Sequence, residues 1–218
     1  MTLFIIIKAI FLLQVLNCVT GDVTCLASNC ICKTLSAVCT GNNLTYIPRF
    51  PQTIWNVTIK NANLSRISEN SYVPNLKTLH LNSNYISLLS TFKCLPSLSF
   101  LSLQDNSIDK IPEEAFSNLF SLKELNLQSA GNRIKRIKRK AFNLSSLEIL
   151  MIGECFYHFD QLNSSALLQF FALVPNLQIL NMENNPLPRD THSMSLLFKP
   201  ISKIRKLHLD SCKLYQLR

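Results

Sequence analysis

A motif of regularly spaced leucine and asparagine residues recurs along most of this chain and constrains its fold more than any other feature. The shared pattern is LxxLxLxxNxI, and its clearest copies occupy residues 76–86, 98–108, 177–187 and 204–214. Degenerate copies begin at residues 54, 122 and 147, which makes seven copies. Successive copies start 22, 22, 24, 25, 30 and 27 residues apart. Self-similarity at this period predicts a solenoid in which each copy forms one supersecondary unit.

The spacing within each copy predicts a short β-strand. Side chains alternate between the two faces of a strand, so both leucines of x-Leu-x-Leu-x point to one face and enter the core. One strand cannot bury its leucines alone, and the copies must therefore stack into a parallel sheet. The predicted fold class is an α/β leucine-rich-repeat solenoid with a curved parallel β-sheet on its concave face. Irregular and short helical segments are expected on the convex side.

The asparagine of the motif is expected to satisfy backbone groups where the chain leaves each strand, because its amide both donates and accepts hydrogen bonds. Asn84, Asn106 and Asn185 hold this position. Cys155 and Cys212 replace it in two copies. A thiol is a weaker donor than an amide, and we expect both to be buried structural thiols.

Two copies depart from the pattern. After the fourth strand the segment Gln-Ser-Ala-Gly delays Asn132 by two positions, which predicts a small bulge. The fifth copy is stretched to 30 residues, and within it residues 166–173 follow two serines and are expected to form a capped helix. The return segments 111–119 and 137–144 each contain a phenylalanine that is expected to pack behind the strands.

The N-terminus predicts export. Residues 4–16 form an apolar run interrupted only by Lys8 and Gln14, which has the length of a signal-peptide core and is shorter than the roughly 20 residues of a transmembrane helix. Cleavage is expected after Gly21, an uncleaved anchor being the alternative. Removing residues 1–21 takes away one lysine and no acid, so the formal charge falls from +9 to +8. A basic chain favours acidic partners in general.

Cysteines and glycosylation acceptors agree with export. Cys25, Cys30, Cys32 and Cys39 form a cluster without the paired Cys-x2-Cys knuckles of zinc sites, so it predicts two disulfides with three possible connectivities. The N-glycosylation acceptors are Asn43, Asn56, Asn63, Asn143 and Asn163. The expected parts of the chain are a signal peptide (1–21), a cysteine-rich N-terminal cap (22–53) and about seven repeats (54–218).

The cysteine cluster, the segment NLTYIPRFP at 43–51 and the LxxLxLxxN copies that follow resemble the N-terminal cap and first repeats of extracellular leucine-rich-repeat proteins. This resemblance covers essentially the whole mature chain. In that family the cap cysteines usually pair first with third and second with fourth. The resemblance therefore implies bridges Cys25–Cys32 and Cys30–Cys39 within a disulfide-bonded N-terminal cap.

Within this superfamily the chain most resembles the N-terminal part of a Toll-like receptor ectodomain, because such ectodomains mix regular repeats with longer irregular ones. That resemblance implies a pattern-recognition receptor of innate immunity that binds a protein or microbial-type ligand and dimerises at full length. Its place would be the extracellular or lumenal face of the cell-surface or endosomal membrane. The alternative is a secreted or membrane-attached adhesion, matrix or guidance protein. The sequence carries no membrane span and stops soon after a repeat motif, so we expect a fragment, or a secreted protein if the chain is complete.

No motif indicates catalysis or a cofactor. The chain has no Gly-x-Ser-x-Gly and no His-Glu-x-x-His, and its four glycines leave little room for a phosphate-binding loop. His80 and His208 occupy outward strand positions in distant repeats, so we expect no joint metal site. The predicted function is therefore binding without catalysis, cofactor or metal, with a secreted enzyme as the least favoured alternative.

One segment is strongly basic. Residues 133–140, the basic segment, contain Arg133, Lys135, Arg136, Lys138, Arg139 and Lys140. Ile134 and Ile137 interrupt them at core positions, so the basic side chains are expected to point outward. The segment is a candidate site for a polyanion such as nucleic acid, glycan sulfate or a lipid headgroup. A solvated edge without a ligand is the alternative.

The outward strand positions form the second candidate surface. Apolar and aromatic residues recur there, and such groups on an exposed face often mark a contact site. The candidate ligand-binding residues are Trp55, His80, Phe100, Ile149, Met151, Ile179 and His208. A glycan on Asn56 would cover the first strand. The alternative is a ligand on a lateral edge or on further repeats.

Overall fold

The computed structural model describes residues 29–41, 44–67, 73–90, 92, 95–129, 131–138, 140–156 and 171–212. The predicted signal peptide lies outside these ranges, and so do Cys25, Asn43, Arg139 and Asn163. Most of the helix predicted at 166–173 also lies outside them. Its last three residues, 171–173, form a bend and a turn.

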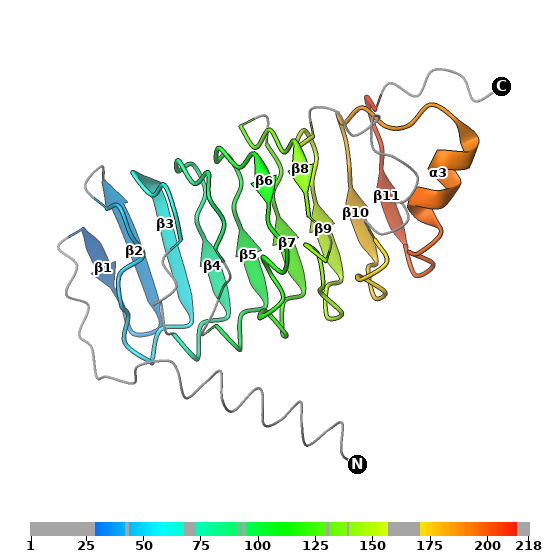
Figure 1. The fold of residues 1–218 in the computed structure, drawn as a ribbon. Helices are drawn as coiled ribbons and strands as arrows, with labels where there is room; N and C mark the ends of the chain where they lie inside the picture. The colour runs from blue at the N-terminus through cyan, green and yellow to red at the C-terminus, as the bar shows by residue number, and fades with distance from the viewer. Residues whose placement is uncertain are drawn as a thin grey trace, which may run out of the picture.

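The N-terminal cap and the repeats build one nine-stranded sheet (Figure 1), in the order β1-β2-β3-β4-β5-β7-β9-β10-β11. Only β1 is antiparallel to its neighbour, and every other adjacent pair is parallel. The strands are β1 (Cys30–Cys32), β2 (Ser36–Gly41), β3 (Asn56–Ala62), β4 (Thr78–His80), β5 (Phe100–Ser102), β7 (Glu124–Asn126), β9 (Ile149–Met151), β10 (Ile179–Asn181) and β11 (Lys206–His208). The seven strands from β3 onward each lie in one sequence copy, so the predicted parallel solenoid is confirmed.

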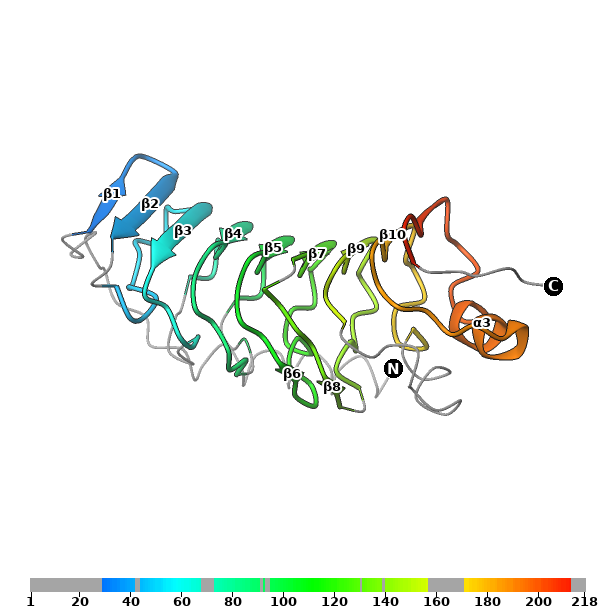
Figure 2. The ribbon, with the colours of Figure 1, turned by 90° about the horizontal axis from the view of Figure 1, so that it is seen from above.

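The return segments lie on the other side of the solenoid. Figure 2 shows the long sheet along the inner side of an arc and two short strands, β6 (Lys110–Ile111) and β8 (Arg136–Ile137), on the outer side. These two strands pair in parallel. An isolated parallel bridge between Arg66 and Leu88 stands at the corresponding place in earlier repeats.

One helix among the described residues, α3 (Thr191–Phe198), was missed in the sequence. Its N-cap is Asp190, whose carboxylate accepts a hydrogen bond from the Ser193 N–H at 2.7 Å. Hydrogen bonds from Ser193 lower the pKa of this carboxyl below its ordinary value. An aspartate before a partly apolar segment is an ordinary helix-start signal, and it was present here.

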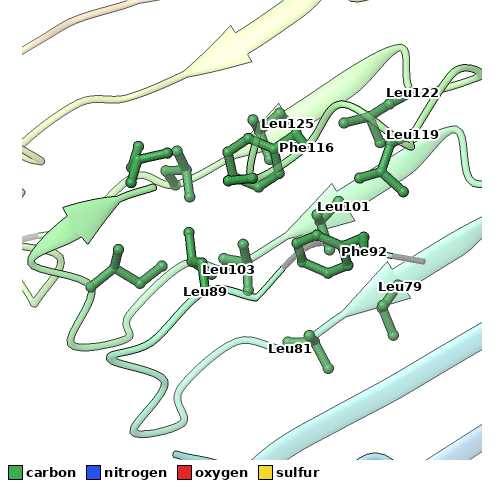
Figure 3. Close-up of a cluster of buried hydrophobic side chains, with 14 of the residues drawn as sticks. Leu79, Leu81, Leu89, Phe92, Leu101, Leu103, Phe116, Leu119, Leu122 and Leu125 are labelled. Atoms are coloured by element: carbon green, nitrogen blue, oxygen red, sulfur yellow. The ribbon is translucent and has the colours of Figure 1, made fainter. Parts of the chain in front are cut away.

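The core follows the alternation expected from the motif. Leu79 and Leu81 are 1% and 0% exposed, whereas Thr78 and His80 between and beside them face solvent in part. Figure 3 shows leucines of successive strands packed against phenylalanines of the return segments. The rings of Phe92, Phe116 and Phe142 stack one repeat above another, with centroid distances of 5.8 and 5.9 Å. Each fully buried side chain of this size stabilises the fold by about 1.5–3 kcal/mol.

The motif asparagines bind the backbone of two neighbouring copies. The Oδ1 of Asn106 accepts a hydrogen bond from the Ile86 N–H (3.0 Å), and its Nδ2 donates to the carbonyl oxygens of Leu81 (3.0 Å) and Leu103 (2.9 Å). The same kind of contacts recur at Asn84, Asn132 and Asn185. Each amide therefore ties the end of its own strand to the preceding copy.

The two-residue delay before Asn132 is absorbed by an extra turn. Ser129 is buried, and its Oγ accepts a hydrogen bond from the Gly131 N–H at 2.7 Å. The Asn132 N–H donates to the Ser129 carbonyl oxygen at 3.2 Å. This turn brings the amide of Asn132 back to the position that the other asparagines occupy.

Cys155 and Cys212 take the place of the asparagine as predicted. Their Sγ atoms donate to the carbonyl oxygens of Leu127 (2.8 Å) and Met182 (3.1 Å). Both thiols are free and buried. Burial raises the pKa of Cys155 to about 12. The thiol therefore stays protonated at neutral pH and keeps the proton that it donates.

We expect Asn106→Ala to lower the free energy of unfolding by about 3 kcal/mol, because it leaves buried backbone groups of two copies without partners. Denaturant titration followed by circular dichroism measures the change. Asn75→Ala removes only an exposed hydrogen bond to the Gln52 carbonyl oxygen and should cost less than about 0.5 kcal/mol. Equal losses in the two variants would show that the buried amide has no special role.

Gly131→Ala should also be destabilising. A Cβ at this position would stand 2.5 Å from the backbone carbonyl oxygen of Asn106, which cannot move without disturbing the neighbouring copy. We expect a loss of about 1–3 kcal/mol in the same titration. Gly153→Ala is the comparison, since the three atoms nearest to its Cβ would all be side-chain atoms, the closest being the Asn181 Oδ1 at 3.0 Å. A smaller loss for Gly131→Ala than for Gly153→Ala would contradict this explanation.

Candidate binding surfaces

The outward side chains of the strands form two parallel rows on the concave face. Strand register places one residue of each copy beside its equivalent in the next. One row runs Asn56, Thr78, Phe100, Glu124, Ile149, Ile179 and Lys206. The other row runs Thr58, His80, Ser102, Asn126, Met151, Asn181 and His208. Glu124 separates Phe100 from the adjacent pair Ile149 and Ile179.

A partly desolvated cluster lies in the middle of this face. The rings of His80 and Phe100 are in tilted contact, with centroids 4.8 Å apart. Burial lowers the pKa of His80 below its ordinary value, so its imidazole is neutral at physiological pH. Burial also raises the pKa of the Glu124 carboxyl beside Phe100. The Oγ of Ser102 is buried and has no hydrogen-bond partner within the described part of the chain.

The N-terminal end of the face is apolar and exposed, and of its residues the sequence predicted only Trp55. Trp55 is 44% exposed, and the Lys77 ammonium lies 4.2 Å from the centroid of its ring. Val38 and Ile31 are register partners on β2 and β1 and are 43% and 70% exposed. Val38 is the register partner of Thr58, so these apolar side chains continue the second outward row onto the cap. The sequence signal that could have identified Val38 is the alternation of side chains along a strand that contains the cap cysteine Cys39.

The remaining candidate residues are spread along the same face. Met151 is half-buried between Asn126 and Asn181. His208 stands at the far end of the sheet, with its Nδ1 3.6 Å from the Oε1 of Glu183. The sheet therefore does not bring His80 and His208 together, in agreement with their separation in the sequence.

A polar hollow lies beside this face, where the strands end. It has a volume of about 440 Å³ and follows the extra turn before Asn132. Tyr85, Gln104, Gln128 and Glu154 are among the side chains that line it. The hollow could not be predicted from the sequence, because residues of four different copies contribute to its wall.

The basic segment lies on the outer side, around β8. Ile134 is 2% exposed and Ile137 is half-buried, and the basic side chains between and beside them face solvent. The exposed basic residues are Arg133, Lys135, Arg136, Lys138 and Lys140. Lys110 on β6 is the register partner of Arg136 and extends the positive surface. None of the five exposed residues of the basic segment takes part in an ion pair between described residues.

The N-terminal cap contains a disulfide between Cys30 and Cys39, the second of the two pairs that the family resemblance implies. Cys32 is also disulfide-bonded, and its implied partner, Cys25, lies outside the described residues. The Cys30–Cys39 bridge joins register partners of β1 and β2. It fixes the antiparallel hairpin that covers the first edge of the parallel sheet.

The glycosylation acceptors within the described residues are all exposed: Asn56, Asn63 and Asn143. Asn56 stands in the first outward row next to Trp55, so a glycan there would cover the apolar end of the face. No helix in the described ranges is both long and apolar enough to cross a membrane.

Comparison with known proteins defines the class to which this fold belongs. The leucine rich repeat family model matches residues 55–108 and 74–129. With the solenoid described above, these matches show that the chain is a leucine-rich-repeat protein.

Several curated proteins are similar in sequence. Keratocan of Mus musculus is 30% identical over 156 residues, which are 68% of this chain and 42% of keratocan. Human epiphycan is 28% identical over 190 residues, 84% of this chain and 54% of epiphycan. Leucine-rich repeat-containing protein 3B of Bos taurus is 38% identical over 91 residues, 40% of this chain and 34% of that protein. The chain spans about half or less of the length of these relatives.

Two solved structures show the same fold. TLR13 in complex with ssRNA13 superposes with a TM-score of 0.61 at 17% identity, over 80% of this chain and 29% of that one. Human 5T4, the trophoblast glycoprotein, superposes with a TM-score of 0.54 at 19% identity, over 88% of this chain and 64% of that one. At these identities the likeness concerns the fold alone.

If the protein binds a polyanion, replacing Lys135, Arg136 and Lys138 by serine should weaken that binding by about tenfold at low salt and flatten its salt dependence. Elution from immobilised heparin and binding to single-stranded RNA at several salt concentrations measure both effects. A control with Lys33, Lys60 and Lys199 replaced by serine loses the same charge from other exposed places. An equal change in the control would show that the effect depends on net charge alone. The basic segment would then be a solvated edge without a ligand.

Proposed function

We propose that this chain is the binding region of an extracellular leucine-rich-repeat protein of the matrix type, which recognises a protein through the concave strand face. Relatives such as keratocan, osteomodulin and epiphycan, which are small leucine-rich-repeat proteoglycans, support the matrix setting. The observation that carries the proposal is the grouping of exposed and half-exposed apolar side chains on one rigid, hydrogen-bonded sheet. The function is binding without catalysis.

The face suits protein recognition because its anchors are ordered before binding. Trp55 is held by the Lys77 ammonium, and Phe100 rests against the His80 ring. Aromatic side chains held in this way lose little conformational freedom on binding, so more of their contact energy contributes to affinity. The polar residues of the second row, such as Asn126, supply hydrogen bonds beside these anchors.

The Toll-like receptor reading was our first expectation from the sequence, and the comparisons favour the matrix alternative instead. Keratocan, osteomodulin and epiphycan are small leucine-rich-repeat proteoglycans, and the likeness to TLR13 rests on the fold. The receptor hypothesis and the matrix hypothesis both imply an extracellular location. Only the receptor hypothesis implies an endosomal membrane. A transcript that continued into a membrane span and a Toll/interleukin-receptor domain would restore the receptor reading.

Retention of the purified chain on extracellular matrix laid down by cultured cells tests the proposal. A wash at about 1 M salt, where charge interactions are screened beyond about 3 Å, removes molecules held only by their net charge. We expect the unmodified chain to stay bound. A variant with Phe100, Ile149 and Ile179 replaced by serine should be retained about tenfold less, because lost contacts worth about 1.4 kcal/mol weaken binding by that factor.

Phe120→Ser is the matched control for this experiment. Phe120 is 51% exposed but stands in the turn before β7, away from the outward rows. It should therefore be retained like the unmodified chain. Equal retention of the triple variant and the unmodified chain would show that the concave face is not the binding surface.

A further inference from the structure

Three potential metal ligands converge at the far end of the described sheet. Glu183 follows β10, His208 is the last residue of β11, and Asp210 lies two residues further on. One ligand atom from each side chain can be chosen so that all lie within 4.8 Å of one another. Glu183 belongs to a different copy from the other two, so the cluster was not evident in the sequence.

The parallel register of β10 and β11 explains why these side chains meet. Asn181 is the register partner of His208, and just beyond it the Asn184 N–H donates to the Asp210 carbonyl oxygen at 2.9 Å. Glu183 and Asp210 therefore lie side by side where the two strands end. His208 and Asp210 are two residues apart, and both side chains come within reach of Glu183.

The spacing suits a small divalent cation. The His208 Nδ1 lies 3.6 Å from the Glu183 Oε1, and the two side chains are 46% and 27% exposed. Ligand atoms about 2.1 Å from a tetrahedral zinc ion are roughly 3.4 Å apart. This pair is already close to that separation. The Asp210 carboxylate lies within 4.8 Å of both atoms, so it has to approach by at most about 1.4 Å, which a side-chain rotation on an exposed residue provides.

The donor set distinguishes between metals. Calcium takes six to eight oxygen ligands and has no use for an imidazole nitrogen. One imidazole with two carboxylates suits zinc, which is bound in open sites by three protein ligands and one further donor. Two carboxylates also neutralise the charge of the ion.

The geometry points to a zinc-binding site formed by Glu183, His208 and Asp210, with its fourth position left to water. The bound ion would link β10 to β11 at the end of the described sheet, where Leu207 is 41% exposed although it stands in register with the buried core leucines. Because zinc would bind only the folded arrangement, it would stabilise this last repeat. This site lies at the far end of the concave face, several strands away from Phe100, and does not depend on the proposed function.

Calorimetric titration of Zn²⁺ alone into the untagged, metal-stripped chain tests the site. We expect one Zn²⁺ per chain and at least tenfold weaker binding for both His208→Gln and Asp210→Asn, since each removes a direct ligand. Titration of Ca²⁺ alone should give much weaker binding than Zn²⁺. Unchanged zinc affinity in His208→Gln would overturn the proposal.

Two controls separate this site from other places where zinc could bind. His192→Gln alters an exposed histidine on α3 and should leave the affinity for Zn²⁺ unchanged. Titration of the unmodified chain with Co²⁺ reports the ligand type by absorption. A spectrum without a thiolate-to-cobalt charge-transfer band supports nitrogen and oxygen ligands. A strong band of that kind would place the metal at a cysteine and overturn the assignment.

Discussion

The hydrogen bonds between the motif asparagines and the backbone of two neighbouring copies are the constraint on which the rest of this structure depends. Most strands of the sheet are only three residues long, too short to fix the stacking of repeats by their own ladder. Asn106 shows how the amide compensates, since it bonds one N–H and two carbonyl groups in a buried place. Without such partners these buried backbone groups would lack hydrogen bonds, at a cost of about 1–3 kcal/mol each.

Three of the turns that carry these asparagines adopt a left-handed conformation without a glycine, which the hydrogen bonds explain. Ser83, Asp105 and Asn184, each directly before a motif asparagine, have φ values of 53°, 54° and 57°. A left-handed conformation is unfavourable for serine and aspartate outside a supporting structure. The hydrogen bonds of the asparagine side chains supply that support. Residues other than glycine can therefore occupy these positions.

The same stacking separates surfaces of different character. Outward strand residues gather apolar side chains such as Phe100 and Ile149 on the concave side, whereas the basic segment follows β8 on the outer side. Where the strands end, Glu154 accepts a hydrogen bond from Asn184, and Glu183 and Asp210 continue that acidic edge. A chain of net charge +9 thus presents an apolar, a basic and an acidic surface at different places on the solenoid.

The repeat, the strand in each copy, the inward leucines and the motif asparagines could all be predicted from the sequence, because they follow from spacings that recur along the chain. The cysteine cluster and the family resemblance predicted the disulfide-bonded cap. The sequence also placed Phe100, Ile149 and Ile179 on the outward side. Which residues of different copies become neighbours depends on the tertiary structure. The unequal copy lengths hide the register from the sequence, yet register alone joins Val38 to Thr58 and Glu183 to Asp210 across separate strands. The apolar end of the face, the polar hollow and the three-ligand cluster each draw on residues from different copies, so they exist only once the copies are stacked.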